Sequence, residues 1–267
     1  MSDWRPRLIA SDMDGTLLRS DETIGEPTVA ELGRWLADGV PVVLATGRPP
    51  RWMRQIREVL PTGTAVCCNG AVLLDLESFR IVHEEALQPE VLESVTSELR
   101  RRQPGTWFAV EYGLEFRHEP VYKPRWDVDA PGVAEATLAE MVAQPVAKLL
   151  ARHEDLPRDD FVALVEDVVG DRATVTHSST DALAEISAPG VTKASGLATV
   201  AAGHGIEPGD VVVFGDMPND IAAFEWVRAA GGRAVAMAHA HPDLLAVATD
   251  VTGSNEDDGV AAFLAAL

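Results

Sequence analysis

Short apolar runs that end in polar loops constrain the fold of this chain most. Residues 8–11, 41–45 and 211–214 lack the polar alternation of a half-exposed strand, which is typical of strands buried on both faces. Apolar residues at helical spacing follow the first two runs, over residues 27–38 and 50–60. Strands that alternate with helices pair in parallel through right-handed crossovers. Both ends of the chain therefore predict an α/β unit.

The middle of the chain has a different pattern. Helices are expected over 89–102, 132–142 and 157–168, and strands over 106–111, 114–118, 146–151, 173–177 and 183–187. Hairpins mixed with helices favour an antiparallel sheet that is covered on one face. The first pattern resumes after Gly190, with further strands expected at 233–237 and 249–251. Residues 83–189 are therefore predicted to form a domain inserted into a discontinuous core of residues 1–82 and 190–267.

Composition narrows the classes of function. The 267 residues are 46% hydrophobic and 24% charged, as in ordinary globular proteins. With 42 acidic and 22 basic side chains the formal charge is −20, which repels nucleic-acid phosphates and anionic lipid surfaces. No segment approaches the roughly twenty apolar residues that span a bilayer. We expect a cytoplasmic protein, monomeric or homodimeric, without nucleic-acid or membrane partners, in which Cys67 and Cys68 are buried thiols.

Three polar loops follow the predicted core strands. They are Asp12-Met-Asp14-Gly-Thr, Thr46-Gly47-Arg48, and Gly215-Asp216-Met-Pro-Asn219-Asp220. Taken alone, the first loop could be a simple Asp-Gly turn. However, the carboxyl ends of parallel strands meet at one edge of a sheet, where α/β proteins bind their ligands. We therefore expect the four aspartates of these loops to converge.

Four carboxylates that share a partly dry cleft need a neutralising positive charge. Their ligand atoms are all oxygens, with no His or Cys in the loops, and this favours Mg²⁺ over Zn²⁺. Lys193, near the start of a helix expected over 192–202, is a candidate for a second positive charge. The alternative for Lys193 is a solvated lysine at a helix start.

The same motifs carry a family resemblance. The two aspartates of the first loop, Thr46, Lys193 and the Gly215–Asp220 loop resemble, in order and spacing, the four motifs of the haloacid dehalogenase (HAD) superfamily. The insertion before the third motif, together with Asn69-Gly-Ala, Ala236-Met-Ala and Ser254-Asn-Glu-Asp-Asp-Gly-Val, resembles the Cof-type sugar-phosphate phosphatases. The resemblance implies an α/β fold, with a Rossmann-like doubly wound parallel sheet as core and an inserted α+β cap domain.

The resemblance also implies a role for each motif residue. Asp12 would be the nucleophile that becomes an aspartyl phosphate, and Asp14 would be the general acid and base. Phosphate would be bound by Thr46, Gly47, Lys193 and Asn219. Magnesium would be bound by the side chains of Asp12 and Asp216 and by the carbonyl of Asp14. Asp220 would orient phosphate, metal-bound water or Lys193, and Arg48 would either contact the cleft mouth or be structural.

The implied function is hydrolysis of a small phosphorylated metabolite, such as a sugar phosphate, with Mg²⁺ as cofactor. A dehalogenase is disfavoured because residue 14 is an aspartate, which suits an alkoxide leaving group. Two alternatives stay open. The first is a phosphosugar mutase of the phosphomannomutase kind, although the basic residues of the insertion, such as Arg100, Arg101 and Arg102, are scattered. The second is an inactive regulator that binds a phosphorylated metabolite.

Several residues are left without an assigned role. His239 stands where the Cof-type subfamily commonly has Asn, and it is expected to be a surface or core residue. Trp107 and Trp126 are candidates for stacking against a sugar ring. Lys123 and Arg125 would either neutralise an acidic substrate or solvate a loop.

Overall fold

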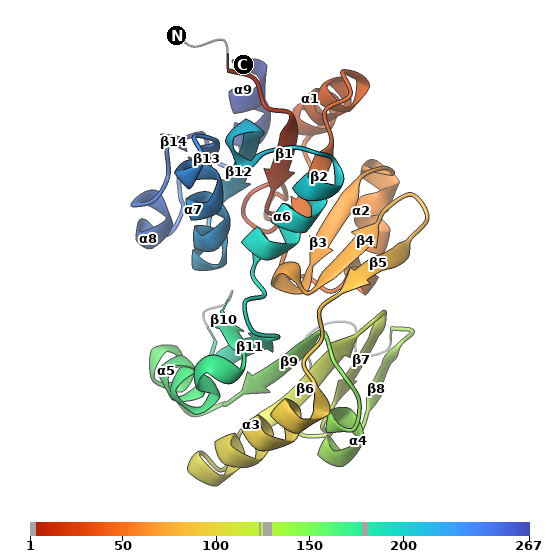
Figure 1. Cartoon of the computed structure of the whole chain (residues 1–267), viewed down its shortest axis with the longest axis vertical. Coiled ribbons are helices and arrows are strands. Elements are labelled where there is room, and N and C mark those ends of the chain that lie inside the picture. The colour runs from red at the N-terminus through yellow and green to blue at the C-terminus, as the bar shows by residue number, and fades with distance from the viewer. Residues whose placement is uncertain (1–3, 123, 125–129, 178–180) are drawn as a thin grey trace.

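Successive side chains of the core strands point to opposite faces of the larger sheet and form an apolar cluster on each face. Helices cover both of these faces (Figure 1). The computed structural model describes residues 4–122, 124, 130–177 and 181–267. Within them the larger sheet has eight strands in the order β14-β13-β12-β1-β2-β3-β4-β5. The strands are β1 (Leu8–Ser11), β2 (Val42–Ala45), β3 (Thr64–Cys67), β4 (Val72–Asp75), β5 (Arg80–Glu84), β12 (Val211–Gly215), β13 (Arg233–Ala236) and β14 (Asp250–Val251). From β14 to β3 all pairs are parallel, and β4 and β5 continue the sheet antiparallel.

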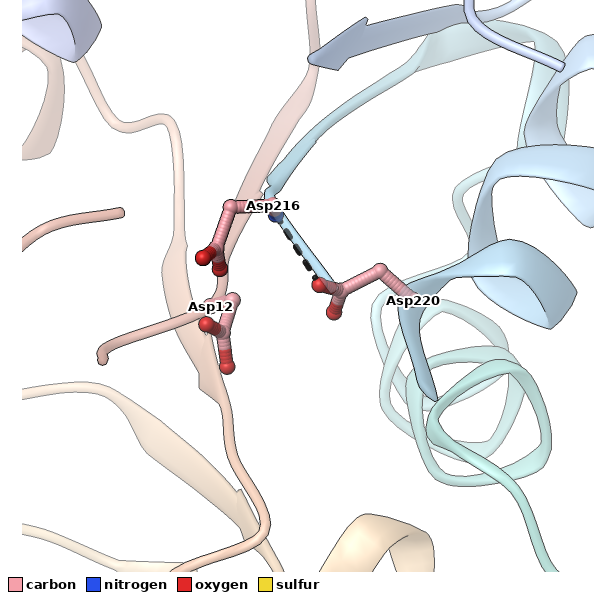
Figure 2. Close-up of side chains that lie close together, drawn as sticks. All are labelled: Asp12, Asp216 and Asp220. Carbon is pink, nitrogen blue, oxygen red and sulfur yellow. Dashed lines mark hydrogen bonds between the residues drawn. The ribbon is translucent and has the colours of Figure 1, made fainter. Parts of the chain in front are cut away.

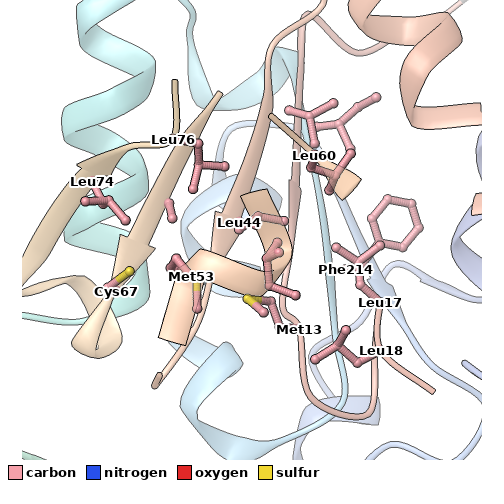
Figure 3. Close-up of a cluster of buried hydrophobic side chains, with 14 of the residues drawn as sticks. Met13, Leu17, Leu18, Leu44, Met53, Leu60, Cys67, Leu74, Leu76 and Phe214 are labelled. Carbon is pink, nitrogen blue, oxygen red and sulfur yellow. The ribbon is translucent and has the colours of Figure 1, made fainter. Parts of the chain in front are cut away.

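One face of this sheet packs against α1 (Glu26–Ala37), α2 (Met53–Val59) and α9 (Gly259–Ala265). Figure 3 shows part of that core, in which Leu44 and Phe214 of the strands lie with Met13 and Met53. The other face packs against α6 (Lys193–Gly203), α7 (Ile221–Ala229) and α8 (Pro242–Leu245). Fully burying one such Leu or Phe stabilises the fold by roughly 1.5–3 kcal/mol. The strands are apolar on both faces because both faces are covered.

The smaller sheet has, within the described residues, the strand order β10-β11-β9-β6-β7-β8. Its strands are β6 (Trp107–Tyr112), β7 (Glu115–His118), β8 (Val133–Glu135), β9 (Lys148–Arg152), β10 (Thr174–Thr176) and β11 (Leu183–Ser187). Neighbouring strands are antiparallel except for β7 and β8, which are parallel. Helices α3 (Pro89–Arg102), α4 (Leu138–Val142) and α5 (Arg158–Val169) share an apolar core with one face, as predicted.

Side-chain alternation gives the two faces of this smaller sheet different characters. Phe108 and Val110 of β6 point into the helix-covered core, whereas Glu111 lines a cavity on the opposite side. Lys148 of β9 and Glu185 of β11 line the same cavity. The face of the smaller sheet that helices leave uncovered therefore lines a cavity opposite the loops at the edge of the larger sheet.

The helix predicted over residues 132–142 is wrong in its first half. Gly132 has a φ of 90° and turns the chain into β8, which pairs with β7. The helix α4 begins only after Thr137, whose hydroxyl accepts from the Glu140 N–H in a capping box. Among the short elements, β5 and α8 were not predicted.

These sheets confirm the predicted α/β class, with a doubly wound core and a second α+β sheet. The division into a core of residues 1–82 and 190–267 and a cap of residues 83–189 stays a prediction, and β5 continues the larger sheet to Glu84. No helix among the described residues is both long enough and apolar enough to cross a bilayer.

Candidate active site

The loops predicted to carry chemistry meet at the carboxyl end of β1, the topological switch point of the larger sheet. From β1 the sheet extends through β2 on one side and through β12 on the other. Asp12 follows β1, and its N–H donates to the Phe214 carbonyl at 2.9 Å. Thr46 follows β2 and Asp216 follows β12. Open α/β sheets bind ligands at such points because the loops there diverge and leave a crevice.

Of the four aspartates predicted to converge, three form a buried cluster and Asp14 lies apart from them. One carboxylate oxygen from each of Asp12, Asp216 and Asp220 lies within 4.8 Å of the others. Figure 2 shows Asp12 and Asp216 close together, with Asp220 approaching from the start of α7. The Asp220 Oδ2 accepts from the N–H groups of Asp216 and Met217, both at 3.1 Å. The Thr16 hydroxyl donates to the Asp216 Oδ1 at 3.2 Å. These bonds fix the orientation of two of the three carboxylates.

Lys193 neutralises part of this cluster. Its side chain is 1% exposed, and its Nζ donates to the Oδ1 atoms of Asp12 and Asp220, each at 2.6 Å. Burial by itself would lower the pKa of Lys193, but the two carboxylates outweigh burial and raise it. The solvated-lysine alternative is therefore wrong.

The pKa values of two of the carboxyl groups are raised as well, in their case by burial. Burial raises the pKa of Asp12 well above its ordinary value, although Lys193 opposes the shift. Burial, and then the neighbouring Asp220, raises the pKa of Asp216 to about 6. Both directions reflect an excess of negative charge in a water-poor site.

Glycines allow the close packing around this cluster. Gly15 has a φ of 75°, and a Cβ there would lie 2.4 Å from the Asp216 Oδ2. Gly70 has a φ of 114°, and a Cβ there would lie 2.0 Å from the Thr192 carbonyl oxygen. Thr192 caps α6, so the missing side chain of Gly70 lets the helix bring Lys193 to the cluster.

Asp14 lies at the entrance, apart from the buried cluster. Its side chain is 56% exposed, and its carboxylate accepts from Arg48 Nε at 2.9 Å and from Arg48 Nη2 at 2.5 Å. Arg48 therefore lies beside Asp14 in the wall of the cavity. The Arg48 N–H donates to the Thr46 hydroxyl at 3.0 Å, and Thr46 is fully buried.

Asn219, a predicted site residue, and His239, which had no assigned role, reach the site from the side. The Asn219 amide donates to the Asn69 Oδ1 at 3.1 Å. His239 Nε2 lies 2.9 Å from the Gly15 carbonyl oxygen, to which it donates as the Nε2–H tautomer, and 4.0 Å from the Asp216 Oδ2. His239 thus contacts the first motif from the surface, where its side chain is 42% exposed.

A cavity of about 1040 Å³ lies above these loops, between the two sheets. Its walls combine the loop residues Asp12, Asp14, Gly47, Arg48 and Asn219 with side chains of the smaller sheet, among them Glu111, Phe116, Lys148 and Glu185. The charged cavity residues of the smaller sheet were not predicted. A signal was available, because Glu111, Lys148 and Glu185 are charged positions in otherwise mainly apolar strands.

Of the four insertion residues left without an assigned role, only Trp107 is among the described residues. Trp107 packs against the apolar cluster that includes Phe116 and Tyr122. Trp126, Lys123 and Arg125 lie outside the described residues.

The donor set fits the predicted magnesium ion. Three carboxylates face one ammonium group, so the buried cluster keeps an excess of negative charge. Its free donor atoms are oxygens, which Mg²⁺ prefers. The absence of a side chain at Gly15 leaves the Asp216 Oδ2 unobstructed on the side that faces the first motif.

Known proteins resemble this chain over nearly its whole length. The family model of haloacid dehalogenase-like hydrolases matches residues 9–264. The 5-amino-6-(5-phospho-D-ribitylamino)uracil phosphatase of Bacillus subtilis (strain 168) is 28% identical over 97% of both chains. The pyridoxal phosphate phosphatase of Escherichia coli (strain K12) is 28% identical, also over 97% of both chains. A solved HAD superfamily phosphatase from Bacteroides thetaiotaomicron has a TM-score of 0.81 at 20% identity, covering 98% of this chain and 95% of its own. Because the family match spans nearly the whole length, the chain belongs to the haloacid dehalogenase-like hydrolases, as its motifs predicted.

Proposed function

We propose that this hydrolase is a magnesium-dependent phosphatase that acts on a small phosphorylated metabolite through an aspartyl phosphate on Asp12. The supporting observation is the pairing of Asp12 with the buried Lys193, inside an acidic cluster that opens into a cavity of about 1040 Å³. A cavity of this size suits a small metabolite.

Asp12 acts as the nucleophile, and Asp14 acts as the general acid and then as the general base. The Asp12 carboxylate attacks phosphorus while the bond from phosphorus to the leaving oxygen breaks, and Asp14 gives that oxygen its proton. Asp14 then removes a proton from a water molecule, which attacks phosphorus and releases phosphate from Asp12. Because the carboxylate of Asp14 is bound to Arg48, this contact must loosen for Asp14 to carry a proton.

The other residues stabilise charge on the phosphoryl group. The Thr46 hydroxyl, the Gly47 N–H, Lys193 and Asn219 would contact its non-bridging oxygens. Asp12, Asp216 and the carbonyl of Asp14 would hold Mg²⁺, which supplies further positive charge at those oxygens. Asp220 holds Lys193 in place through their 2.6 Å bond.

The relatives support a small phosphomonoester as substrate. Two of them are named as phosphatases of a phosphoribityl-aminouracil and of pyridoxal phosphate. A sugar phosphate has the same reacting group. A panel of phosphorylated sugars, nucleotides and cofactors, assayed for phosphate release, would identify the preferred class.

The mutase alternative would need a second phosphate cradle in the cap. Arg100 and Arg102 are instead paired with Glu119 and Asp167. The buried Arg51 and Lys148 at the cavity are paired with Glu111 and Glu185. These pairings favour a phosphatase, and the intact nucleophile Asp12 disfavours an inactive regulator.

Phosphate release from p-nitrophenyl phosphate, with and without chelator, tests the proposal. We expect chelation to remove activity and Mg²⁺ to restore it better than Ca²⁺, whose longer and looser coordination misplaces the nucleophile. Full activity in thoroughly chelated protein would refute the metal requirement.

Variants of the first motif test the mechanism. Asp12→Asn should abolish turnover in a folded protein, because the amide has the same shape but is a poor nucleophile. Asp14→Asn should reduce hydrolysis of an alkyl phosphate more than that of p-nitrophenyl phosphate, whose leaving group needs little protonation. Equal losses on the two substrates would contradict the role of Asp14 as the acid.

A further inference from the structure

The loop that carries Thr46 is held by the smaller sheet as well as by its own. Three consecutive carbonyl oxygens of this loop accept hydrogen bonds. The Asn69 N–H donates to the Thr46 oxygen and the Cys68 N–H to the Arg48 oxygen, both at 3.0 Å. Between them, the Gly47 oxygen accepts from the Lys148 Nζ at 2.7 Å. Lys148 belongs to β9, so the middle of the loop is fixed from across the cavity.

Lys148 is part of a bridge that continues to the second loop. Its Nζ donates to the Glu185 Oε2 at 2.6 Å, and the Asn69 Nδ2 donates to the same oxygen at 2.7 Å. The Asn69 Oδ1 in turn accepts from the Asn219 Nδ2 at 3.1 Å. Lys148, Glu185 and Asn69 are at most 4% exposed. The bridge therefore runs from Gly47 to Asn219 through buried polar atoms.

Stability alone does not account for these charges. Burying an ion pair removes two ions from water, and apolar residues of similar volume stabilise a protein as well or better. What the pair adds is a fixed geometry. The Gly47 carbonyl and the Arg48 N–H belong to one planar trans peptide, so they point in opposite directions. By holding the carbonyl, Lys148 also sets the Arg48 N–H, which donates to the Thr46 hydroxyl.

We propose that Lys148 and Glu185 are positioning residues through which the smaller sheet sets both phosphate-contacting loops. Lys148 acts on Thr46 through the peptide between Gly47 and Arg48. Because the Thr46 hydroxyl oxygen accepts from the Arg48 N–H, the Thr46 hydroxyl hydrogen is left to donate to phosphate. Glu185 acts on Asn219 through Asn69. The proposal rests on the proposed function, because it assumes that these loops bind phosphate.

The test is Lys148→Met combined with Glu185→Gln, which removes both charges but keeps an oxygen that can accept from Asn69. Calorimetric titration with inorganic phosphate in the presence of Mg²⁺ gives the affinity, and p-nitrophenyl phosphate gives kcat and KM. We expect at least a tenfold loss of phosphate affinity and of kcat/KM, with a Tm close to that of the wild type. A double variant that keeps wild-type affinity and kcat/KM would overturn the proposal.

A second variant covers failure of the first to fold. Asn69→Gly keeps the left-handed backbone at residue 69, where φ is 54°, but removes the amide that joins Glu185 to Asn219. We expect phosphate to bind it several-fold more weakly, and unchanged binding would overturn the Asn219 arm. Arg100→Met is the control, because it breaks the Arg100–Glu119 pair, which involves neither loop, and should leave phosphate affinity within about twofold of wild type.

The outcomes separate this inference from the proposed function. A wild-type protein that binds phosphate but releases none from substrates would refute the phosphatase activity and leave the bridge testable by calorimetry. A wild-type protein that fails to bind phosphate would overturn both. An active wild type with unaffected bridge variants would overturn the bridge alone.

Discussion

Gly70→Ala should disable the enzyme without touching any residue that performs chemistry. The added Cβ would lie 2.0 Å from the Thr192 carbonyl oxygen, whereas real Cβ atoms essentially never lie closer than 3.0 Å to such an atom. The turn at Gly70 and the start of α6 must therefore separate by about 1 Å. Lys193 directly follows Thr192, and its Nζ lies 2.6 Å from both Asp12 and Asp220. A displacement of ~1 Å would stretch these bonds beyond hydrogen-bonding distance.

The expected magnitudes follow from this displacement. A misplacement of about 1 Å at a catalytic group can reduce kcat/KM by roughly 10²-fold. Overpacking costs about 1–3 kcal/mol, and a left-handed residue with a side chain costs about 1–2 kcal/mol more. At about 2–4 °C per kcal/mol, Tm should fall by roughly 4–20 °C.

A matched control separates backbone strain from the collision. Gly231 has a φ of 89°, and a Cβ there would meet nothing within 4 Å. Gly231→Ala should therefore lower Tm by only a few degrees and leave kcat/KM unchanged. The assays are thermal unfolding by circular dichroism and hydrolysis of p-nitrophenyl phosphate. If Gly70→Ala has the Tm and kcat/KM of Gly231→Ala, the argument that Gly70 places Lys193 is wrong.

Three further predictions concern buried titratable groups. Lys193→Met leaves three carboxylates within 4.8 Å of one another without their ammonium partner. In metal-free protein we expect this variant to lose about 3–5 kcal/mol of unfolding free energy. Adding Mg²⁺ should raise its Tm more than that of the wild type. Burial, opposed by Arg51, raises the pKa of Glu111 from 4.5 to about 7, so folded Glu111 keeps a proton that the unfolded chain releases. Protonated Glu111 therefore stabilises the folded protein fully below pH 4.5, and this contribution is lost as the pH rises through about 7. Relative to Glu111→Gln, the wild type should lose about 3 kcal/mol of unfolding free energy across this range, as measured by urea unfolding. A difference between the two proteins that does not change with pH would contradict the raised pKa of Glu111. Burial raises the pKa of Cys68 to about 12 and that of Cys67 well above its ordinary value, so a thiol reagent at pH 8 should label the native protein only after unfolding.

Residue patterns alone were enough to predict the class of fold and the aspartates that meet at the edge of the larger sheet. Strands such as residues 211–214 are apolar throughout, and a strand of this kind is stable only where helices cover both faces of the sheet. Once the strands are parallel, their carboxyl ends share an edge, so Asp12, Asp216 and Asp220 had to converge. Local patterns were less reliable where tertiary contacts override them. In the first half of the helix predicted over residues 132–142, the chain instead pairs with β7 as β8.

How the two sheets meet could not be predicted from residue patterns, because it depends on contacts between distant segments. Strand alternation indicates that Lys148 and Glu185 share a face of the smaller sheet, but it does not say what that face covers. The distance from Lys148 to the Gly47 carbonyl, 101 residues away in the sequence, depends on how the smaller sheet is seated over the loops. The role of Gly70 likewise depends on α6 packing against the turn, because a left-handed turn alone would explain the glycine equally well. Contacts of this kind are set by the packing of distant segments, which no local pattern encodes.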